Sequence, residues 1–299
     1  MDFTNTTIDK FKAYGGANGN KLSIIHNGER YMLKFPPKKT NKNKISFYSN
    51  GCINEYIACQ IVKSLGLPVQ ETNLGIYTDK KGITKIVVAC KDFETNNKRL
   101  YMFSELKNTC IDSSQNGYGT ELEDIMGAID EQTIIPKDEL ETFFWNMFIA
   151  DALLGNFDRH NGNWGFLMDQ ENQTAEIAPI YDCGSCLYPQ LNEESMSVVL
   201  AKQEEIEKRV FIFPTAQIKE NDDKINYFDF ISSLKNLKCN EALIRITSNV
   251  NLANINKIIN NTPYISEIQR EFYKTMIKAR KEYILDFSVE KLKQQTKRF

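Results

Sequence analysis

The stretch LETFFWNMFIADALL (residues 140–154) constrains the fold more than any other part of the chain. Its apolar residues occupy most of the circumference of a helix, so other elements must surround it on nearly every side. Asp138 with Glu141 resembles a capping box and predicts that the helix begins just before this stretch. Such a helix requires a large core, which 299 residues can supply as one two-lobed unit or as two domains.

An unusually polar loop follows this helix. GNFDRHNGNWG (155–165) holds three asparagines, three glycines and an Asp-Arg-His triplet, far more hydrogen-bonding groups than a plain turn needs. WGFLM and TAEIAPIY then predict two strands joined by the turn DQENQ (169–173). The polar loop therefore lies at the base of a predicted hairpin.

The hairpin predicts where three polar side chains meet. Two antiparallel strands return the chain to its starting point, so Asn163, before the first strand, and Asp182, after the second, are expected to converge. Their hard oxygen atoms suit Mg²⁺. Asp158, five residues before Asn163, would face the same spot, orient an acceptor hydroxyl and accept its proton, as phosphoryl transfer requires. Each residue alone is common in turns, so the prediction rests on the ordered set.

The first ninety or so residues predict a β-rich unit around one helix. KLSIIH (21–26) and ERYMLKF (29–35) flank Asn27-Gly28, which is a strong hairpin signal. NEYIACQIVKSLGLP (54–68) has a helical period, and KIVVAC (85–90) indicates a buried strand.

This unit offers a nucleotide site. The glycine-rich YGGANGN (14–20) could hold phosphates through backbone N–H groups, although it is not a Walker A loop and by itself reads as an ordinary turn. Lys34, in the second strand, could reach the α and β phosphates, and Glu55 is the expected partner that orients it. The alternative is that Lys34 faces solvent and Glu55 only decorates a helix N-terminus.

The rest of the chain is less informative. Beyond residue 225 amphipathic stretches predict helices, whereas the polar segments 105–124 and 189–224 are expected to be irregular. The composition, 41% hydrophobic and 25% charged, is that of a globular protein, and no apolar run could span a bilayer. The polar N-terminus lacks a secretory signal, so we expect a cytoplasmic protein, although delivery by a dedicated secretion system need not leave such a signal.

Charge and cysteine content exclude other functions. A net charge of −2 argues against a general nucleic-acid coat. Seven cysteines are expected to stay reduced. Cys183-Gly-Ser-Cys186 lacks both a second ligand pair and a thioredoxin-like setting, so neither a metal nor a redox role is expected of it.

The motifs together resemble a known family. The glycine loop, Lys34, Glu55, Asp158-x4-Asn163 and Asp182-x-Gly184 occur in protein-kinase order. GNFDRHNGNWGFL followed by PIYDCGS resembles the HipA-like serine/threonine kinases of bacteria, and also the D-R-H-x-x-N loop of phosphatidylinositol kinases. NEYIACQIVKSLGLPV and RYMLKFPP resemble the HipA helix and lysine strand. The motifs span roughly residues 12 to 190.

The resemblance implies a fold and an activity. The fold would be α+β and two-lobed, with a β-rich N-lobe over residues 1–92 and a mostly helical C-lobe over 93–299. ATP would bind with Mg²⁺ between the lobes, and the γ-phosphoryl group would pass to a serine or threonine of a protein, including the kinase itself. Two alternatives remain: a lipid or small-molecule kinase of the same fold, and a non-catalytic nucleotide-binding scaffold.

The resemblance also implies residue roles. Asp158 would be the catalytic aspartate, Lys34 and Glu55 the phosphate-binding ion pair, and Asn163 and Asp182 the metal ligands. His160 would orient the catalytic loop, contact the γ-phosphate or simply fill space. Further contacts would come from the glycine loop to phosphate and from one strand's backbone to adenine: Gly15, Gly16, Ala17, Asn18, Gly19, and Ala89, Cys90, Lys91.

Two features depart from the family and its distant relatives. Typical HipA toxins carry an N-terminal subdomain used in antitoxin and DNA complexes, but here the glycine loop begins near residue 14, so an antitoxin partner is not expected. No Ala-Pro-Glu triplet follows Asp182, so an activation segment of the eukaryotic kind is not expected either.

Overall fold

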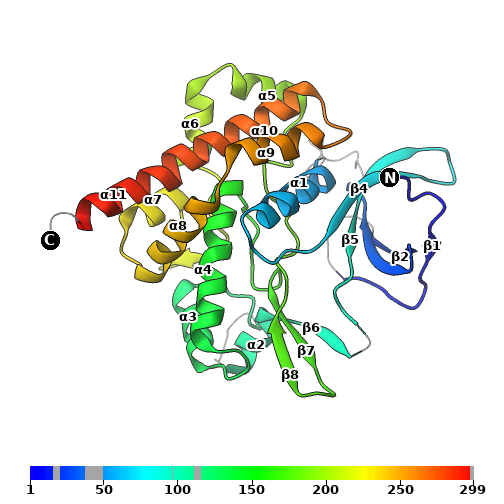
Figure 1. Cartoon of the computed structure of the whole chain (residues 1–299), viewed down its shortest axis with the longest axis horizontal. Coiled ribbons are helices and arrows are strands. Elements are labelled where there is room, and N and C mark those ends of the chain that lie inside the picture. The colour runs from blue at the N-terminus through cyan, green and yellow to red at the C-terminus, as the bar shows by residue number, and fades with distance from the viewer. Residues whose placement is uncertain (16–20, 38–49, 96, 111–115, 297–299) are drawn as a thin grey trace.

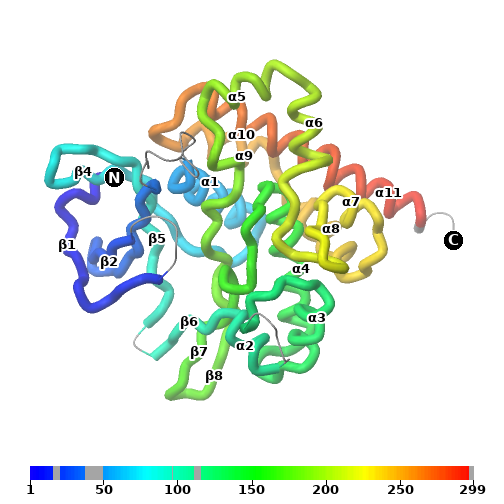
Figure 2. The backbone as a smooth tube through the Cα atoms, turned by 180° about the vertical axis from the view of Figure 1, so that it is seen from behind, coloured from blue at the N-terminus to red at the C-terminus, as the bar shows by residue number. Residues whose placement is uncertain are grey.

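The computed structural model describes residues 1–15, 21–37, 50–95, 97–110 and 116–296. Figure 1 shows an N-terminal sheet on one side of the molecule, a larger assembly of helices on the other, and helix α1 between them. A second, smaller sheet lies beneath the helices. The same arrangement is visible from behind in Figure 2.

The N-terminal sheet is antiparallel and has the strand order β1-β2-β3-β5-β4. Asn27 and Gly28 both have positive φ, 51° and 79°, the conformation of the tight turn that their sequence predicted between β2 and β3. The predicted strands are confirmed to within about one residue. The strands are β1 (Thr7–Ile8), β2 (Lys21–His26), β3 (Glu29–Lys34), β4 (Thr72–Thr78) and β5 (Thr84–Lys91).

Helix α1 (Gly51–Ser64) packs against one face of this sheet and shares a continuous apolar core with the large helical assembly. Polar contacts fix it there as well. Asn54 Nδ2 donates to the carbonyl of Cys186 (2.8 Å), and Tyr273 Oη donates to Asn54 Oδ1 (2.8 Å). At the other end of the helix, Asn249 Nδ2 donates to the carbonyl of Leu65 (3.0 Å). The helix that carries Glu55 is therefore tied to both halves of the molecule.

Helix α4 (Lys137–Leu154) is the buried helix that the sequence predicts. Twelve of its residues are buried, and it ends at Gly155 with φ of +63°, a left-handed cap that suits glycine. The predicted capping box is wrong, because the helix begins at Lys137, one residue earlier than Asp138, and has Pro136 at its N-cap without a side-chain hydrogen bond. Asp138 instead lies in the first turn, where its charge favours the helix N-terminus.

The predicted hairpin is confirmed as β7 (Gly165–Asp169) and β8 (Thr174–Ile177). A third strand, β6 (Lys98–Met102), pairs with β7 and completes a three-stranded sheet in the order β6-β7-β8. The hairpin begins directly after the loop that follows α4.

The prediction of irregular structure over 105–124 and 189–224 is wrong in part, because short amphipathic helices form there. Helices α5 and α6 each bury only a narrow stripe, Met196 and Val199 in one and Ile206, Arg209 and Val210 in the other. The remaining helices and short strands are α2 (Phe103–Cys110), α3 (Leu122–Glu131), α5 (Glu193–Leu200), α6 (Gln203–Phe211), β9 (Lys219–Glu220), β10 (Asp223–Lys224), α7 (Tyr227–Ser233), α8 (Leu237–Asn249), α9 (Leu252–Asn261), α10 (Glu267–Arg280), the π-helical turn η1 (Lys281–Asp286) and α11 (Phe287–Thr296).

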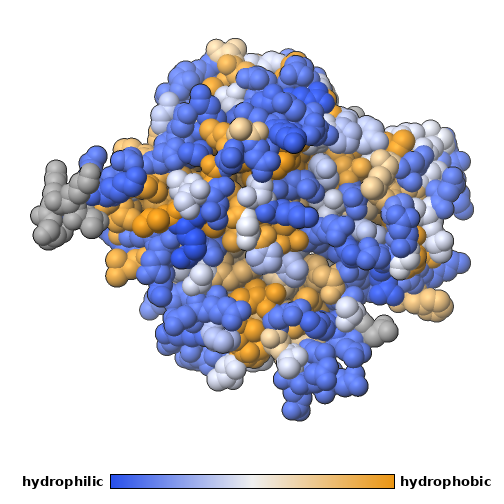
Figure 3. Space-filling view, viewed as in Figure 1, coloured by the Kyte–Doolittle hydropathy of each residue, from blue (hydrophilic) through white to orange (hydrophobic). Residues whose placement is uncertain are grey.

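Hydrophilic residues cover much of the face shown in Figure 3, with hydrophobic residues visible between them. Within the described ranges, every helix is too short or too polar to cross a bilayer.

Candidate active site

Lys34 lies at the centre of a buried charge cluster. Its Nζ is 2.6 Å from Glu55 Oε1 and 2.8 Å from Asp182 Oδ1. The side chains of Lys34 and Glu55 are 12% and 3% exposed, whereas that of Asp182 is 44% exposed and forms the open side of the cluster. Strand β3 contributes Lys34, helix α1 contributes Glu55, and the loop after β8 contributes Asp182. The alternative in which Lys34 faces solvent is therefore wrong.

The charges in this cluster hold one another in ionised form. Burial acts to lower the pKa of Lys34, but the carboxylates of Asp182 and Glu55 outweigh burial and raise it well above its ordinary value. The charge of Lys34 lowers the pKa of Asp182 to about 2. Burial raises the pKa of Glu55, against the opposing effect of Lys34. Asp182 is therefore a permanent anion near neutral pH.

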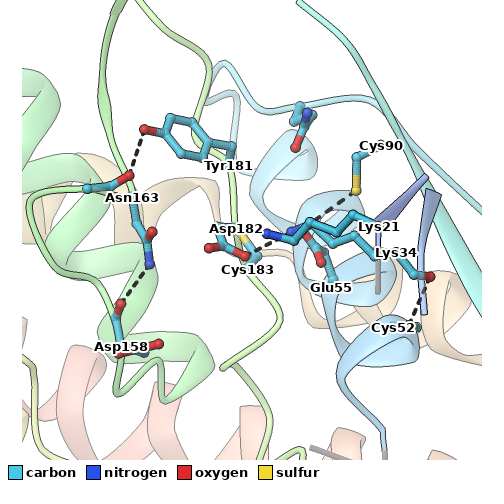
Figure 4. Close-up of polar contacts among 12 residues, drawn as sticks. Lys21, Lys34, Cys52, Glu55, Cys90, Asp158, Asn163, Tyr181, Asp182 and Cys183 are labelled. Carbon is cyan, nitrogen blue, oxygen red and sulfur yellow. Dashed lines mark hydrogen bonds and ion pairs between the residues drawn. The ribbon is translucent and has the colours of Figure 1, made fainter. Parts of the chain in front are cut away.

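The loop after α4 folds around its own hydrogen bonds. The backbone N–H groups of His160 and Asn163 donate to the carbonyls of Asp158 and His160 (2.9 Å each). Asn163 Nδ2 donates to the carbonyl of Asp158 (2.9 Å), so the amide oxygen of Asn163 is the end of the side chain that can act as an acceptor. In Figure 4, Asp158 and Asn163 lie on one side of Asp182, and Lys34 and Glu55 lie on the other.

Arg159 joins this loop to the end of the hairpin, and sequence reasoning missed it. The side chain is buried, with Nε 3.0 Å and Nη2 3.2 Å from the two carboxylate oxygens of Asp151 on α4. Nη1 donates to the carbonyl of Asn163 (3.0 Å) and to the carbonyl of Tyr181. The guanidinium therefore binds both base ends of the hairpin. The sequence signal for a buried arginine here was Asp151, an aspartate inside an otherwise apolar helix.

The hairpin brings its two ends together as its sequence predicts. The backbone N–H of Ala178, just past β8, donates to the carbonyl of Gly165 at the start of β7 (2.9 Å). Tyr181 Oη then donates to the carbonyl of Gly162 (3.0 Å), beside Asn163. Asp182 follows with φ of 56°, a left-handed conformation that aspartate tolerates better than most residues.

The oxygen atoms of Asn163 and Asp182 fit a magnesium ion. Both are hard ligands, and Mg²⁺ is bound in nucleotide enzymes by one or two such groups with phosphates and water completing the coordination. Across the described segments, no three His, Cys, Asp or Glu side chains gather so as to hold a metal without help. The donor set therefore suits a metal that arrives with a phosphate-bearing substrate.

Lys21 is a second lysine at this site, and the sequence did not single it out. It pairs with Lys34 across β2 and β3, so the two side chains leave the same face of the sheet. Its Nζ donates to the carbonyl of Gly15 (2.6 Å), at the root of the glycine-rich segment. Burial and the neighbouring charge of Lys34 lower its pKa. The signal available in the sequence was its strand position directly after the glycine-rich segment.

His160 lies near Asp158 on the loop that follows α4. Its Nδ1 lies 3.0 Å from the backbone N of Gly162 and accepts a hydrogen bond from it in the neutral form of the ring, in which Nε2 carries the proton. The charge of His160 acts to lower the pKa of Asp158, although burial of Asp158 has the larger effect and raises it. This geometry favours a polar role for His160 over simple space filling.

Two groups of residues were expected to contact the nucleotide: the backbone of β5 and the glycine-rich segment. Ala89 and Cys90 pair with residues of both β3 and β4, because β5 is a central strand, and Lys91 pairs with Tyr31 of β3. The carbonyl of Lys91 also accepts a hydrogen bond from Gln70 Nε2, and its N–H donates to the carbonyl of Glu71. Neighbouring segments therefore occupy these backbone groups, and a contact between them and adenine stays a prediction. Gly16, Ala17, Asn18 and Gly19 lie outside the described residues.

Comparison with known proteins gives consistent results. Residues 13–254 match the family model of the HipA-like C-terminal domain. The serine/threonine-protein kinase CtkA of Helicobacter pylori is 50% identical over 287 residues, which cover 96% of this chain and 86% of that protein.

Solved structures extend the comparison to the fold. The crystal structure of a Helicobacter pylori proinflammatory kinase, CtkA, superposes with a TM-score of 0.90 at 49% identity and covers 97% of both chains. HipA of Shewanella oneidensis, in a complex with HipB and operator DNA, superposes with a TM-score of 0.52 at 15% identity, over 95% of this chain and 69% of that one. The second likeness concerns the fold alone, and the α+β, two-lobed kinase-like architecture is confirmed.

Proposed function

This chain belongs to the HipA-like family, and we propose that it is a serine/threonine-protein kinase that transfers the γ-phosphoryl group of ATP to a protein hydroxyl. The observation that carries the proposal is the position of Lys34, held between Glu55 and Asp182 and facing the loop of Asp158. Kinases require this lysine–glutamate ion pair and the metal-binding aspartate to be in place together.

The position of each residue indicates its role in phosphoryl transfer. Lys34, oriented by Glu55, binds the phosphates, and Lys21 supplies a second positive charge on the same face of the sheet. Asp158 orients the acceptor hydroxyl and accepts its proton. Within the described segments, the hydrogen bonds of Asp158 use its backbone N–H and carbonyl, which leaves the carboxylate for the acceptor. His160 directs an N–H donor from the same loop, which suits a contact with the γ-phosphate.

Asn163 and Asp182 would hold Mg²⁺, which neutralises the phosphate charge when bound. Arg159 acts through these residues. By joining Asp151 to the carbonyls of Asn163 and Tyr181, it keeps the two ligands at a fixed separation. The division into a lobe over residues 1–92 and a lobe over 93–299 remains part of the proposal.

The test is turnover with labelled ATP and Mg²⁺, offered a generic protein, an inositide and an aminoglycoside as separate acceptors. We expect label in the protein acceptor and in the kinase itself, with mass spectrometry locating it on serine or threonine. Asp158→Asn should lower the rate by about 10²–10⁴-fold, the usual contribution of a general base, while ATP binding persists. Asp130→Asn, at an exposed pair with Lys137, is the matched control.

Each alternative predicts a different result. Label in the inositide or aminoglycoside alone would identify a lipid or small-molecule kinase. The Asp-Arg-His sequence of the loop, which resembles that of phosphatidylinositol kinases, is the reason to test this alternative. ATP binding without ADP release would identify a scaffold. Equal turnover by the wild type and Asp158→Asn would contradict the assignment of the catalytic residue.

A further inference from the structure

Arg280, the last residue of α10, is a buried cation that lacks a carboxylate partner among the described residues. Its side chain is 1% exposed. Of the three arginines that are buried in the described ranges, Arg159 and Arg209 each pair with a carboxylate, whereas Arg280 forms no such pair. A buried charge without a counter-charge costs free energy. Stability alone therefore does not explain a charged side chain at this position.

Arg280 binds the end of the helix that precedes the loop of Asp158. Its Nε donates to the carbonyl of Ala152, in the last turn of α4 (2.7 Å). The helical ladder releases this carbonyl, because the N–H of Asn156 donates to the carbonyl of Asp151 instead (3.0 Å). Carbonyl groups at a helix C-terminus carry partial negative charge, which suits a guanidinium. The side chain of Arg280 thus takes the place of a missing backbone donor.

A second contact connects Arg280 to the loop itself. The guanidinium carbon lies 5.7 Å from the centre of the Tyr227 ring, and Tyr227 Oη donates to the carbonyl of Asn156 (2.6 Å). The side-chain oxygen of Asn156 in turn accepts a hydrogen bond from the backbone N–H of Asp158 (3.1 Å). Arg280 therefore contacts both the helix end and the tyrosine that hold Asn156, two residues before Asp158.

The other side of the guanidinium is fixed to α6. Arg280 Nη1 donates to the carbonyl of Arg209 and lies 3.5 Å from Tyr188 Oη, which donates to the same carbonyl (2.7 Å). Directly after Arg280, the π-helical turn η1 continues α10 into α11, so that the three form one long helix in Figure 1. Such turns are frequent at functional sites. Arg280 thus joins the end of α4 to two helices of the C-terminal part.

We propose that Arg280 is a positioning residue for phosphotransfer: it fixes the end of α4 and, through Tyr227 and Asn156, the place of Asp158. The proposal rests on the proposed kinase function. A misplacement of about 1 Å in a catalytic site can lower the rate on the order of 100-fold. The contacts of Arg280 lie on the side of Asp158 and not on that of Lys34, so loss of Arg280 should slow the transfer step more than it weakens nucleotide binding.

The experiment compares the full-length wild type with Arg280→Met, which removes the guanidinium and keeps an unbranched side chain. Phosphotransfer is measured at a temperature at which circular dichroism shows both proteins to be folded. We expect kcat to fall by about 100-fold, with little change in the KM for ATP. Lower stability alone would leave the kcat of the folded protein unchanged.

Arg270→Met is the matched control. Arg270 lies on the same helix, and its Nη2 donates to the carbonyl of Thr262 at the end of α9 (3.3 Å), so it binds a helix end remote in sequence from the loop of Asp158. Its kcat should equal that of the wild type. A wild-type kcat in folded Arg280→Met, or an equal loss in Arg270→Met, would overturn the proposal.

Amide hydrogen exchange tests the positioning without turnover. The backbone N–H groups of His160 and Asn163 donate within the loop of Asp158. They should exchange faster in Arg280→Met and at the wild-type rate in Arg270→Met, and unchanged exchange in Arg280→Met would overturn the proposal. If the wild type does not turn over ATP, the kinase assignment fails, while the exchange rates still decide whether Arg280 holds the loop.

Tyr227→Phe decides the matter if Arg280→Met does not fold. This change removes only the hydroxyl that donates to the carbonyl of Asn156 and keeps the ring against Arg280. We expect kcat to fall by about tenfold, in keeping with the loss of one buried hydrogen bond, and the amides of His160 and Asn163 to exchange faster. Wild-type values of both quantities would overturn the proposal.

Discussion

Lys21 and Lys34 occupy paired positions on strands β2 and β3, so two lysine side chains extend from one face of the sheet toward Asp182. Lys34 is neutralised by two carboxylates, whereas the hydrogen bond of Lys21 Nζ goes to the uncharged carbonyl of Gly15. The two lysines and two carboxylates balance in charge, but the ammonium of Lys21 lies at the root of the glycine-rich segment, where it can contact an anionic ligand.

Replacement of Lys21 should therefore weaken nucleotide binding more than it slows chemistry. Lys21→Met is expected to raise the KM for ATP about tenfold, equivalent to about 1.4 kcal/mol of lost interaction, with a smaller change in kcat. Lys21→Arg keeps the charge and should retain most of the affinity. Steady-state ADP release and calorimetric titration measure both quantities. An unchanged KM in Lys21→Met would place this lysine outside the phosphate site.

Activity should fall on acidification through protonation of Asp158. Burial raises the pKa of this carboxyl, so the acid limb of kcat/KM should lie above the ordinary value of 3.8. The charge of His160 opposes that rise. His160→Gln removes it and should move the acid limb to higher pH, which a pH profile of initial rates would detect. A limb that stays in place would show that the two residues are electrostatically independent.

The contribution of Asp182 to the free energy of unfolding should depend on pH. Its folded-state pKa of about 2 lies below the ordinary 3.8, so the ionised form favours the folded state. This contribution is complete above the ordinary value and is lost as the pH falls toward 2. In urea unfolding at several pH values, the wild type should lose stability relative to Asp182→Asn across that window and nowhere above it. A constant difference would contradict the depressed pKa.

Asp151→Ala should be strongly destabilising, because it leaves the buried guanidinium of Arg159 without its carboxylate. Breaking a buried ion pair in this way costs about 3–5 kcal/mol. Asp130→Ala breaks only an exposed pair with Lys137 and should cost at most about 1 kcal/mol. Denaturant unfolding of both variants gives the comparison directly, and similar losses in the two would mean that the Asp151 pair does not hold the catalytic loop.

Local geometry explains what could be predicted from the sequence. Antiparallel pairing obliges a hairpin to return to its base, so the convergence of Asn163 and Asp182 followed from two strand patterns and one turn. Asn27-Gly28 determined the first hairpin in the same way, and its second strand carries Lys34.

What the sequence did not reveal depends on contacts between distant segments. Arg159 meets Asp151 only because the loop turns back on the helix that precedes it, and Tyr273 meets Asn54 across more than two hundred residues. The backbone of β5 was assigned to adenine because nothing in KIVVAC shows that both of its edges are paired. Helices α5 and α6 were missed because each buries too few apolar residues to show a clear period.

The base of the β7–β8 hairpin must keep its length, whereas the tip of the hairpin can change in length. Its base fixes the distance between Asn163 and Asp182, the proposed metal ligands, whereas its tip, residues 170–173, lies at the far end of the paired strands. Insertions at the tip would leave the base in register. This turn is therefore the place to graft an epitope or a fluorescent reporter without changing the spacing at the base.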